Sequence, residues 1–489
     1  MIRFTSSGWQ GMISREVTFA DIRKASYAVS VHVKENPEYG VSSPEYLESR
    51  GKAHPNPPQV VVGFDSRFMS PDFAQEAAGA LAAQGIKVLL SNSELPTPAL
   101  ARAVLDRLAA GGLMVTAGDK PADFSGLKWI SYWGGAAPQA VTEEIERRSE
   151  FAKANTVKIL GSGPGLKELW IEGADLKPSY FRSLLRFIDV KAVSRAKIKV
   201  AVDAIHGSAK GYLAPFLRDL GADVIEIEDS PDVLFGGRAP RPVPGNLERL
   251  SKLVISKKLS LGLAVDGDGG LFGVIDSGGR WLSANTAFGI IFDHLAGRRG
   301  LRGKAARTVM TSHFIDAVAK SHGTETREVP SGFGSMGELL RGGKYLMGAE
   351  ESGGLYLHEH IPDRDGILAC ALLVEIAAAG KKPLSLIRDD LFKSVGSFHT
   401  TSLCVPLPGY AALEALQGRL HAKPPLDVAQ ASVWRIDETD GFKFVLKDGS
   451  WLGLRPQDEG PSLMLYAEAS SPKRLEDLVR SGKELIQKK

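Results

Sequence analysis

Cysteine is nearly absent from this sequence: among 489 residues there are only two, Cys370 and Cys404. Two cysteines cannot form a disulfide framework or a cysteine-rich zinc site. Both stand in apolar surroundings, so we expect two thiols buried in the core. An excess of charge of one sign is also lacking, because the formal net charge is only +3. So small a charge gives no reason to expect nucleic acid or an anionic membrane as a partner.

Long hydrophobic runs are lacking as well. No stretch approaches the roughly eighteen uninterrupted apolar residues of a membrane span. Residues 1–11 have no basic region followed by an apolar core, so they do not resemble a signal peptide. We therefore expect a soluble cytoplasmic protein. The composition, 43% hydrophobic and 24% charged, is typical of a globular chain, and the length is too great for a single core.

What the sequence does contain is a repeated unit of strand, polar loop, helix, glycine and strand. In the first copy an apolar β-branched run is followed by Ser70 as the helix cap and Pro71 in the first turn. The second copy predicts a helix over about 209–220, and the third ends its helix at Gly323. Alternation at this spacing predicts three similar α/β/α domains with mainly parallel sheets. The copies cover residues 60–92, 198–228 and 306–329.

The C-terminal region has a different pattern. The stretch GFKFVLKDGSWLGLRP predicts two strands joined by a hairpin turn at Asp448-Gly449. The alternating stretch SLMLYAEA predicts a further strand, and a charged helix follows it. A smaller C-terminal α+β domain therefore completes the predicted fold class. We place the four predicted domains at residues 1–155, 156–279, 280–394 and 395–489.

The same segments resemble the α-D-phosphohexomutase superfamily, the phosphoglucomutases and phosphomannomutases, over the whole chain. The resemblance is carried by TSSGWQG, VDAIHGSAKGYL, LFGGRAPRPVPGNL, AVDGDGGLFGVID, GAEESGGLYLHEHIPDRDGI and LRPQDEGPSLMLYAEA. It implies three α/β domains around a central cleft and a fourth, TATA-box-binding-protein-like domain that closes over it. It also implies transfer of a phosphoryl group between C1 and C6 of a hexose phosphate. In that reaction a phosphoserine donates its phosphoryl group beside a Mg²⁺ ion.

The first family loop, T-A-S-H-N-P, corresponds to TAGDKP in this sequence. Gly118 stands at the position of the phosphoserine, and a glycine has no oxygen that could carry a phosphoryl group. Asp119 is the nearest carboxylate, so an aspartyl-phosphate mechanism stays as an alternative. Upstream, Asp65 and Arg67 match the family, and Arg67 could pair either with an anion or with Asp65.

The second family loop, D-G-D-x-D-R, provides the carboxylates for Mg²⁺. Asp266 and Asp268 are retained here, whereas Gly270 replaces the third carboxylate and Leu271 the arginine. A hard cation needs a high density of oxygen ligands, so we expect weak occupancy by Mg²⁺ at most, and no other cofactor. The alternative is that the two aspartates only stabilise the turn.

The third family loop binds the sugar, and it matches this sequence in full. Two carboxylates would accept hydrogen bonds from sugar hydroxyls, and glycine would let the backbone approach the ring. The alternative is an acidic pair at a helix end. The family's G-F-K lysine, by contrast, corresponds to Gly334. The matching residues are Glu350, Glu351, Ser352, Gly353 and Gly354.

The fourth family loop, R-P-S-G-T-E-P, anchors the phosphate that does not react. Arg455 and Pro456 are retained, but Gln457, Asp458 and Glu459 follow them. Two acids therefore stand where hydroxyl groups would meet a dianion, which is electrostatically unfavourable.

All these losses affect the handling of phosphate, whereas the scaffold motifs are kept. We therefore predict a catalytically impaired member of the family, a pseudoenzyme. It would bind a hexose or hexose phosphate and act as a binding, scaffold or regulatory protein, with a protein partner. The alternative is an active mutase with a phosphoryl carrier other than serine. The sequence does not identify the sugar, the partner or the oligomeric state.

Overall fold

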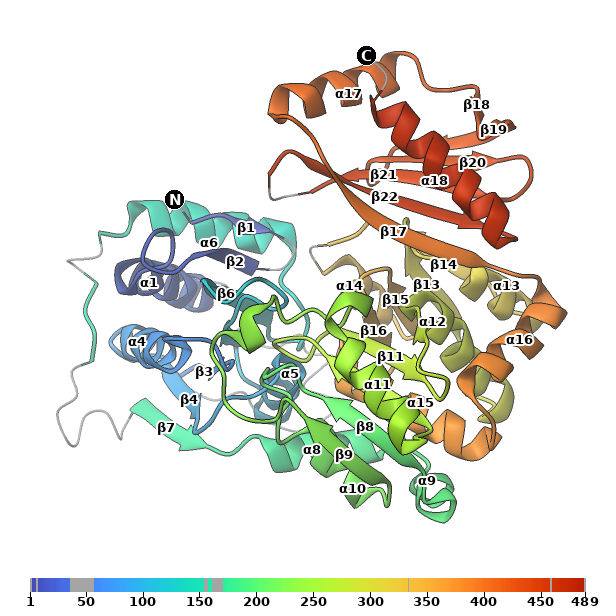
Figure 1. Cartoon of the computed structure of the whole chain (residues 1–489). Helices are drawn as coiled ribbons and strands as arrows, with labels where there is room; N and C mark the ends of the chain where they lie inside the picture. The colour runs from blue at the N-terminus through green and yellow to red at the C-terminus, as the bar shows by residue number, and fades with distance from the viewer. Residues whose placement is uncertain are drawn as a thin grey trace. The chain divides into compact units, whose positions relative to one another are not determined.

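The computed structural model describes residues 2–5, 8–35, 57–153, 157–160, 170–332, 334–457 and 460–487. It divides into two compact units. Figure 1 labels the helices and strands of the chain. No helix of the described residues is both long and apolar enough to cross a membrane. The first unit contains Met1–Leu282, Gly332–Gly343 and Gly353–Leu384, and the second contains Ser283–Ser331, Lys344–Ser352 and Ser385–Lys489.

The N-terminal sheet of the first unit has the strand order β1-β2-β6-β5-β3-β4-β7. Strands β5, β3, β4 and β7 are parallel, whereas β6, β2 and β1 are antiparallel. Helices α1, α4 and α6 contribute to the same hydrophobic core as the central strands. The strands are Phe4–Thr5, Gly8–Met12, Gln59–Phe64, Lys87–Ser91, Gly111–Val115, Phe124–Ser131 and Ile171–Ala174 for β1 to β7, and the helices are α1 Phe19–Glu35, α4 Ser70–Ala82, α5 Thr97–Arg107 and α6 Gln139–Phe151.

The predicted cap of helix α4 is wrong by one residue. Met69, in the left-handed region at φ 64°, precedes the helix, and Ser70 is the first helical residue. The hydroxyl of Ser70 donates to Asp65 Oδ1 at 2.7 Å instead of capping the helix. A buried carboxylate competes for that hydroxyl, and the sequence pattern around the cap does not show this competition.

The second sheet of the first unit has the order β12-β11-β10-β8-β9, with β10, β8 and β9 parallel. Helix α10 begins at Leu213, later than the predicted 209, because Gly211 at φ +73° interrupts the chain before it. The strands are β8 Lys199–Asp203, β9 Asp223–Ile227, β10 Leu261–Val265, β11 Phe272–Asp276 and β12 Trp281–Leu282, and the helices are α8 Lys177–Leu185, α9 Val190–Ala196, α10 Leu213–Asp219, α11 Glu248–Lys257, α14 Ser335–Arg341 and α15 Gly366–Gly380.

The second unit starts with the third α/β copy, in which β14, β13 and β15 are parallel. Helix α13 ends at Ser321, and Gly323 follows it at φ +70°, as the sequence pattern predicted. These elements are β13 Lys304–Thr308, β14 Thr326–Val329, β15 Tyr345–Glu350, α12 Ala284–Asp293, α13 Phe314–Ser321 and α16 Leu384–Val395.

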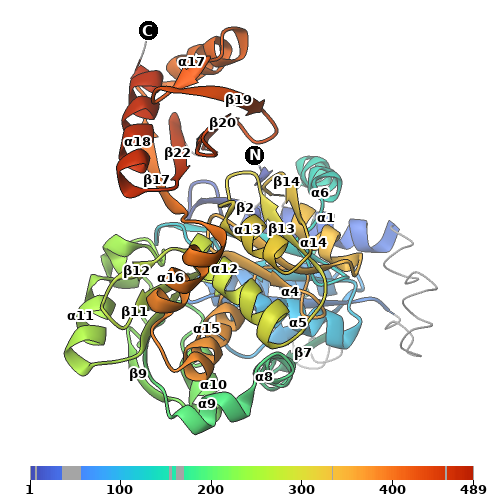
Figure 2. The same cartoon turned by 90° about the vertical axis from the view of Figure 1, so that its right-hand side faces the viewer.

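The C-terminal sheet of this unit is antiparallel, with the order β17-β22-β21-β20-β19-β18. Helix α18 packs against β22, β21 and β17 (Figure 2), and α17 contributes to the same core. This confirms the predicted α+β domain with its hairpin between β20 and β21. The elements are β17 His399–Pro406, β18 Asp427–Val428, β19 Ala431–Asp437, β20 Phe442–Leu446, β21 Trp451–Pro456, β22 Ser462–Ala469, α17 Tyr410–Ala422 and α18 Pro472–Gln487.

The prediction for the cysteines is correct for Cys370 and wrong for Cys404. Cys370 is buried in helix α15, whereas Cys404 is exposed. Residues alternate between the two faces of β17, and Cys404 stands on the outward one.

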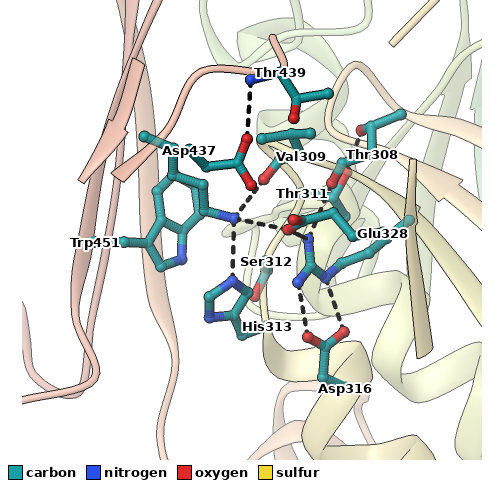
Figure 3. Close-up of polar contacts among 12 residues, drawn as sticks. Thr308, Val309, Thr311, Ser312, His313, Asp316, Glu328, Asp437, Thr439 and Trp451 are labelled. Atoms are coloured by element: carbon teal, nitrogen blue, oxygen red, sulfur yellow. Dashed lines mark hydrogen bonds and ion pairs between the residues drawn. The ribbon is translucent and has the colours of Figure 1, made fainter. Parts of the chain in front are cut away.

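A buried polar cluster joins the C-terminal sheet to the third α/β layer within the second unit (Figure 3). Lys443, whose side chain is 0% exposed, donates to Val309 O at 2.5 Å, His313 Nε2 at 3.1 Å and Glu328 Oε2 at 3.3 Å. Arg307 forms two hydrogen bonds with Asp316, both at 2.8 Å. Burial lowers the pKa of Lys443 to about 8. The cluster surrounds the end of β13, where Thr308 donates to Glu351.

Candidate functional site

Gly118 lies in the loop that follows strand β5, within the first unit. Its φ of +57° is in the left-handed region, and its N–H donates to Thr116 Oγ1 at 2.9 Å. A Cβ at this position would lie 3.5 Å from Lys128 Nζ and 3.8 Å from Asp268 Oδ1, which is ordinary contact. A serine side chain would therefore fit the space, although the left-handed backbone disfavours it.

Arg67 holds this loop in shape. Its Nε donates to Asp65 Oδ2 at 3.0 Å. Its Nη1 and Nη2 donate to four backbone carbonyl oxygens of the loop. All the donors of a guanidinium group are thereby used inside the protein, and the side chain is 0% exposed. Of the two alternatives open from the sequence, the structure contains the ion pair with Asp65. The four carbonyls belong to Gly118 (2.7 Å), Lys120 (2.8 Å), Pro121 (2.6 Å) and Phe124 (3.1 Å).

The second loop follows strand β10 and contacts the first. A Cβ on Gly267 would lie only 2.4 Å from the carbonyl oxygen of Gly118, so only glycine permits this approach. Asp266 accepts the N–H of Leu271 at 2.9 Å. Asp268 Oδ2 accepts from Thr97 Oγ1 at 2.6 Å and from Lys128 Nζ at 2.5 Å.

The two aspartates of this loop differ in their electrostatic environment. Burial, followed by the charge of Asp268, raises the pKa of Asp266 well above its usual range. Burial by itself would also raise the pKa of Asp268. The charge of Lys128 and the hydrogen bonds from Lys128 and Thr97 outweigh burial, so the pKa of Asp268 lies below its usual range. Asp268 is therefore the carboxylate whose negative charge is balanced by a protein cation.

The residues present at this loop do not fit Mg²⁺. Gly118 and Gly270 supply no side-chain oxygen, and Lys128 already occupies an oxygen of Asp268. Within the described part of the chain, no group of three or more His, Cys, Asp or Glu side chains could hold a metal ion. Mg²⁺ requires near-octahedral oxygen coordination, and one of the two aspartates, Asp268, already shares an oxygen with Lys128 and Thr97.

Asp119 is oriented toward a different partner. Its carboxylate forms an ion pair with Arg241 at 2.9 Å, and Arg241 Nε also donates to the backbone carbonyl of Asp119 at 3.2 Å. The Asp119 side chain is 31% exposed, whereas Asp268 is 2% exposed. The carboxylate next to Gly118 is thus held at the protein surface by an arginine.

A small cavity lies beside the Lys128–Asp268 pair in the first unit. Its volume is about 30 Å³, which is room for ordered water and not for a sugar. Residues lining it include Thr97, Lys128, Asp268, Asp363 and Arg364.

Residues 350–352 of the loop predicted to bind sugar lie in the second unit, where β15 ends at Glu350. Glu351 Oε2 accepts from Thr308 Oγ1 at 2.5 Å, and Glu351 Oε1 pairs with Arg455 Nη1 at 2.6 Å. The Ser352 hydroxyl lies 3.4 Å from Glu350 Oε2. Glu351 is therefore engaged within the protein. Gly353 belongs to the first unit, where its carbonyl accepts the N–H of Phe272 at 3.3 Å.

Arg455 is the penultimate residue of strand β21 and connects several polar groups of the second unit. It donates to Ser331 Oγ at 2.8 Å and Tyr466 OH at 2.9 Å, and it pairs with Asp440 at 3.2 Å. Burial opposes the charge of Arg455, but the carboxylates of Glu351 and Asp440 outweigh burial and raise its pKa. Asp458 and Glu459, the two acids predicted to disturb the phosphate anchor, lie outside the described residues.

Gly334 occupies a position that excludes the family's lysine. Its φ is +73°, and a Cβ would lie 2.6 Å from the carbonyl oxygen of Ala136. Any side chain there would require the backbone to shift, so the local structure does not accommodate a lysine at position 334.

Two important residues of the first unit, Lys128 and Thr97, were missed by the sequence analysis. Lys128 belongs to strand β6, and its pairing with Met114 of β5 brings it beside Gly118. A lone lysine in an alternating segment is ordinarily a solvent-facing residue, so no local pattern distinguishes it.

A buried carboxyl pair at the ends of β8 and β9 was also missed. Asp203 Oδ1 accepts the N–H of Ile205 at 2.9 Å, and Glu228 pairs with Arg238 at 2.5 Å. Burial, followed by the charge of Glu228, raises the pKa of Asp203 from 3.8 to about 7. Because the folded pKa lies above the unfolded one, the stability contributed by this proton is complete below pH 3.8 and is lost as the pH rises through about 7.

We expect the variant Asp203→Asn to be more stable than the natural protein at pH 8, by about 1–3 kcal/mol. The amide keeps the acceptor for Ile205 and removes a carboxylate that resists ionisation. Urea unfolding at pH 5 and pH 8 measures the effect, and the gain should be smaller at pH 5. Asp223→Asn, at an exposed residue of the neighbouring strand, is the matched control. A destabilised Asp203→Asn at pH 8 would contradict the assignment.

Comparison with known proteins extends these observations to the whole chain. Three models for the alpha/beta/alpha domains of phosphoglucomutase/phosphomannomutase match residues 1–156 (domain I), 178–279 (domain II) and 283–395 (domain III). The chain is 26% identical to a phosphoglucomutase/phosphomannomutase of Thermococcus kodakarensis, over 99% of this chain and 98% of the relative. It is 27% identical to a phosphopentomutase of the same organism, over 86% and 88%.

A solved structure shows the same arrangement of the chain. The crystal structure of a Thermus thermophilus protein, provisionally named a phosphomannomutase, superposes with a TM-score of 0.82 at 29% identity. The superposition covers 99% of each chain.

Proposed function

Because the chain belongs to the phosphoglucomutase/phosphomannomutase family, we propose that it binds a hexose or hexose phosphate without relaying a phosphoryl group. The observation that carries the proposal is Gly118 at the family's phosphoserine position, with the Lys128 ammonium next to it. A relay needs a nucleophilic oxygen that can hold the phosphoryl group between its two transfers. The protein would then act as a binding, scaffold or regulatory member of the family.

The neighbouring groups support this proposal. Arg67 uses its donors on the loop itself, so no donor is left for a transferred phosphate. Asp119, the carboxylate of the alternative mechanism, pairs with Arg241. A serine at position 118 would therefore not by itself restore phosphoryl transfer.

We expect no interconversion of hexose 1-phosphate and 6-phosphate in the presence of Mg²⁺ and a hexose bisphosphate. Glucose, mannose and glucosamine phosphates are tested, together with a pentose phosphate because one relative is named a phosphopentomutase. Intact mass spectrometry after incubation should show no added phosphate. The variant Gly118→Ser should also remain inactive, since the metal loop would still lack its third carboxylate. Turnover by the natural protein that disappears in Asp119→Asn would instead establish the alternative mechanism.

Sugar binding is tested separately by isothermal titration with the same phosphates. We expect Glu350→Gln to weaken binding by at least about tenfold, because a charged acceptor for sugar hydroxyls is removed. Glu359→Gln is the matched control, since Glu359 is an exposed glutamate outside the loop. Binding that is equal in all three proteins would exclude this loop as the sugar site.

A further inference from the structure

We propose that the ammonium group of Lys128 is the resident cation of the second loop, and that this loop needs no divalent metal ion. The proposal concerns the charge balance of Asp266 and Asp268. It stands independently of the proposed function, since a mutase or a binding protein could equally carry such a site.

The contact between Lys128 and Asp268 is short and buried. Nζ lies 2.5 Å from Oδ2, and the two side chains are 12% and 2% exposed. Thr97 donates to the same carboxylate oxygen, and its own N–H donates to the backbone carbonyl of Asp268 at 2.8 Å. A charge-assisted hydrogen bond at this depth is screened little by water. The lysine is therefore a fixed part of the loop.

The ammonium group of Lys128 lies where a cation could interact both with Asp268 and with a side chain at position 118. It lies on Asp268 and 3.5 Å from where a side chain at residue 118 would begin. By the resemblance noted above, the metal of a complete loop is bound by the aspartates and lies beside the phosphoserine. In this chain a nitrogen of the protein occupies the space between those two positions.

The missing ligands explain why a monovalent cation suffices. A dication is stabilised by several anionic oxygens. Here positions 118 and 270 are glycines, which supply no side-chain oxygen. Nothing in the backbone prevents a carboxylate at 270. A Cβ there would meet Asp268 Oδ1 at 3.6 Å and Arg364 Cβ at 4.0 Å, both ordinary contacts. The metal site can therefore be rebuilt by substitution, which makes the proposal testable.

Titration with Mn²⁺, followed by electron paramagnetic resonance, measures the metal affinity directly. We expect no binding by the natural protein up to about 1 mM Mn²⁺, and a melting temperature that is the same in EDTA and in Mg²⁺. Gly270→Asp combined with Lys128→Met should bind Mn²⁺ at least about tenfold more tightly than Gly270→Asp alone. The reason is that Lys128 competes with the metal for Asp268 in the single variant.

Two controls separate the cation from other effects of substitution. Lys128→Arg keeps a cation beside Asp268. The double variant Lys128→Arg with Gly270→Asp should therefore bind Mn²⁺ as weakly as Gly270→Asp alone. Lys87→Met removes an exposed lysine of the same sheet, so with Gly270→Asp it should leave the affinity unchanged. If the variants do not fold, the Mn²⁺ titration of the natural protein still tests whether the loop binds a divalent metal ion. Sub-millimolar Mn²⁺ binding, or a melting temperature lowered by EDTA, would overturn the proposal.

Discussion

Replacing Arg67 with methionine is expected to lower the free energy of unfolding of the first unit by about 3–5 kcal/mol. The substitution leaves the carboxylate of Asp65 buried without its cation, although the hydroxyls of Ser70 and Thr116 still donate to it. It also removes four donors from the carbonyl groups of the 118–124 segment. Differential scanning calorimetry should show the transition of this unit about 4–7 °C lower.

Two further variants make this prediction specific. Arg67→Lys keeps the charge but offers fewer and differently directed donors, so we expect an intermediate loss. Arg182→Met, at an exposed residue of helix α8, should change the free energy of unfolding by no more than about 0.5 kcal/mol. If Arg67→Met were as stable as this control, Arg67 would not hold the loop, and its guanidinium would have to be reconsidered as an anion ligand.

Replacing Arg455 with methionine is expected to destabilise the second unit by a similar amount, about 3–5 kcal/mol. Glu351 and Asp440 both lie within 3.2 Å of the same Arg455 nitrogen, and their side chains are 7% and 17% exposed. Without the guanidinium, two poorly solvated carboxylates would face each other. Urea unfolding monitored by tryptophan fluorescence measures the loss, since Trp451 and Trp434 both lie in the C-terminal sheet.

The charge at position 455 provides an internal check. Arg455→Lys keeps a cation beside Glu351 and Asp440 but offers fewer donors, so we expect a smaller loss of stability than for Arg455→Met. Arg480→Met removes an exposed arginine of helix α18 and serves as the control. A loss that is as large in Arg455→Lys as in Arg455→Met would show that the geometry of the guanidinium group, and not its charge alone, explains the effect.

Much of the fold follows from local patterns in the sequence. The apolar β-branched run around Val60–Val62 becomes a parallel strand with buried faces, and the Asp448-Gly449 pair becomes a hairpin turn. Gly118 is the clearest case for the candidate site, because the absence of a side-chain oxygen at this position follows from the sequence and needs no coordinates. Three local predictions were wrong. The hydroxyl of Ser70 bonds to the buried Asp65 instead of capping its helix, and helix α10 begins only after the left-handed Gly211. Cys404 stands on the outward face of an edge strand.

The sequence by itself determined the family, the alternation of strands and helices, and the prediction that Gly118 stands at the family's phosphoserine position. Only the tertiary structure decided how the remaining charges are balanced. Arg67 is turned inward onto its own loop, Asp119 is held by Arg241, Asp268 by Lys128, and Glu351 by Arg455. Most of these partners lie far apart in the sequence. Their pairing arises from the register of β5 with β6 and the contact between neighbouring loops, which local propensity does not encode.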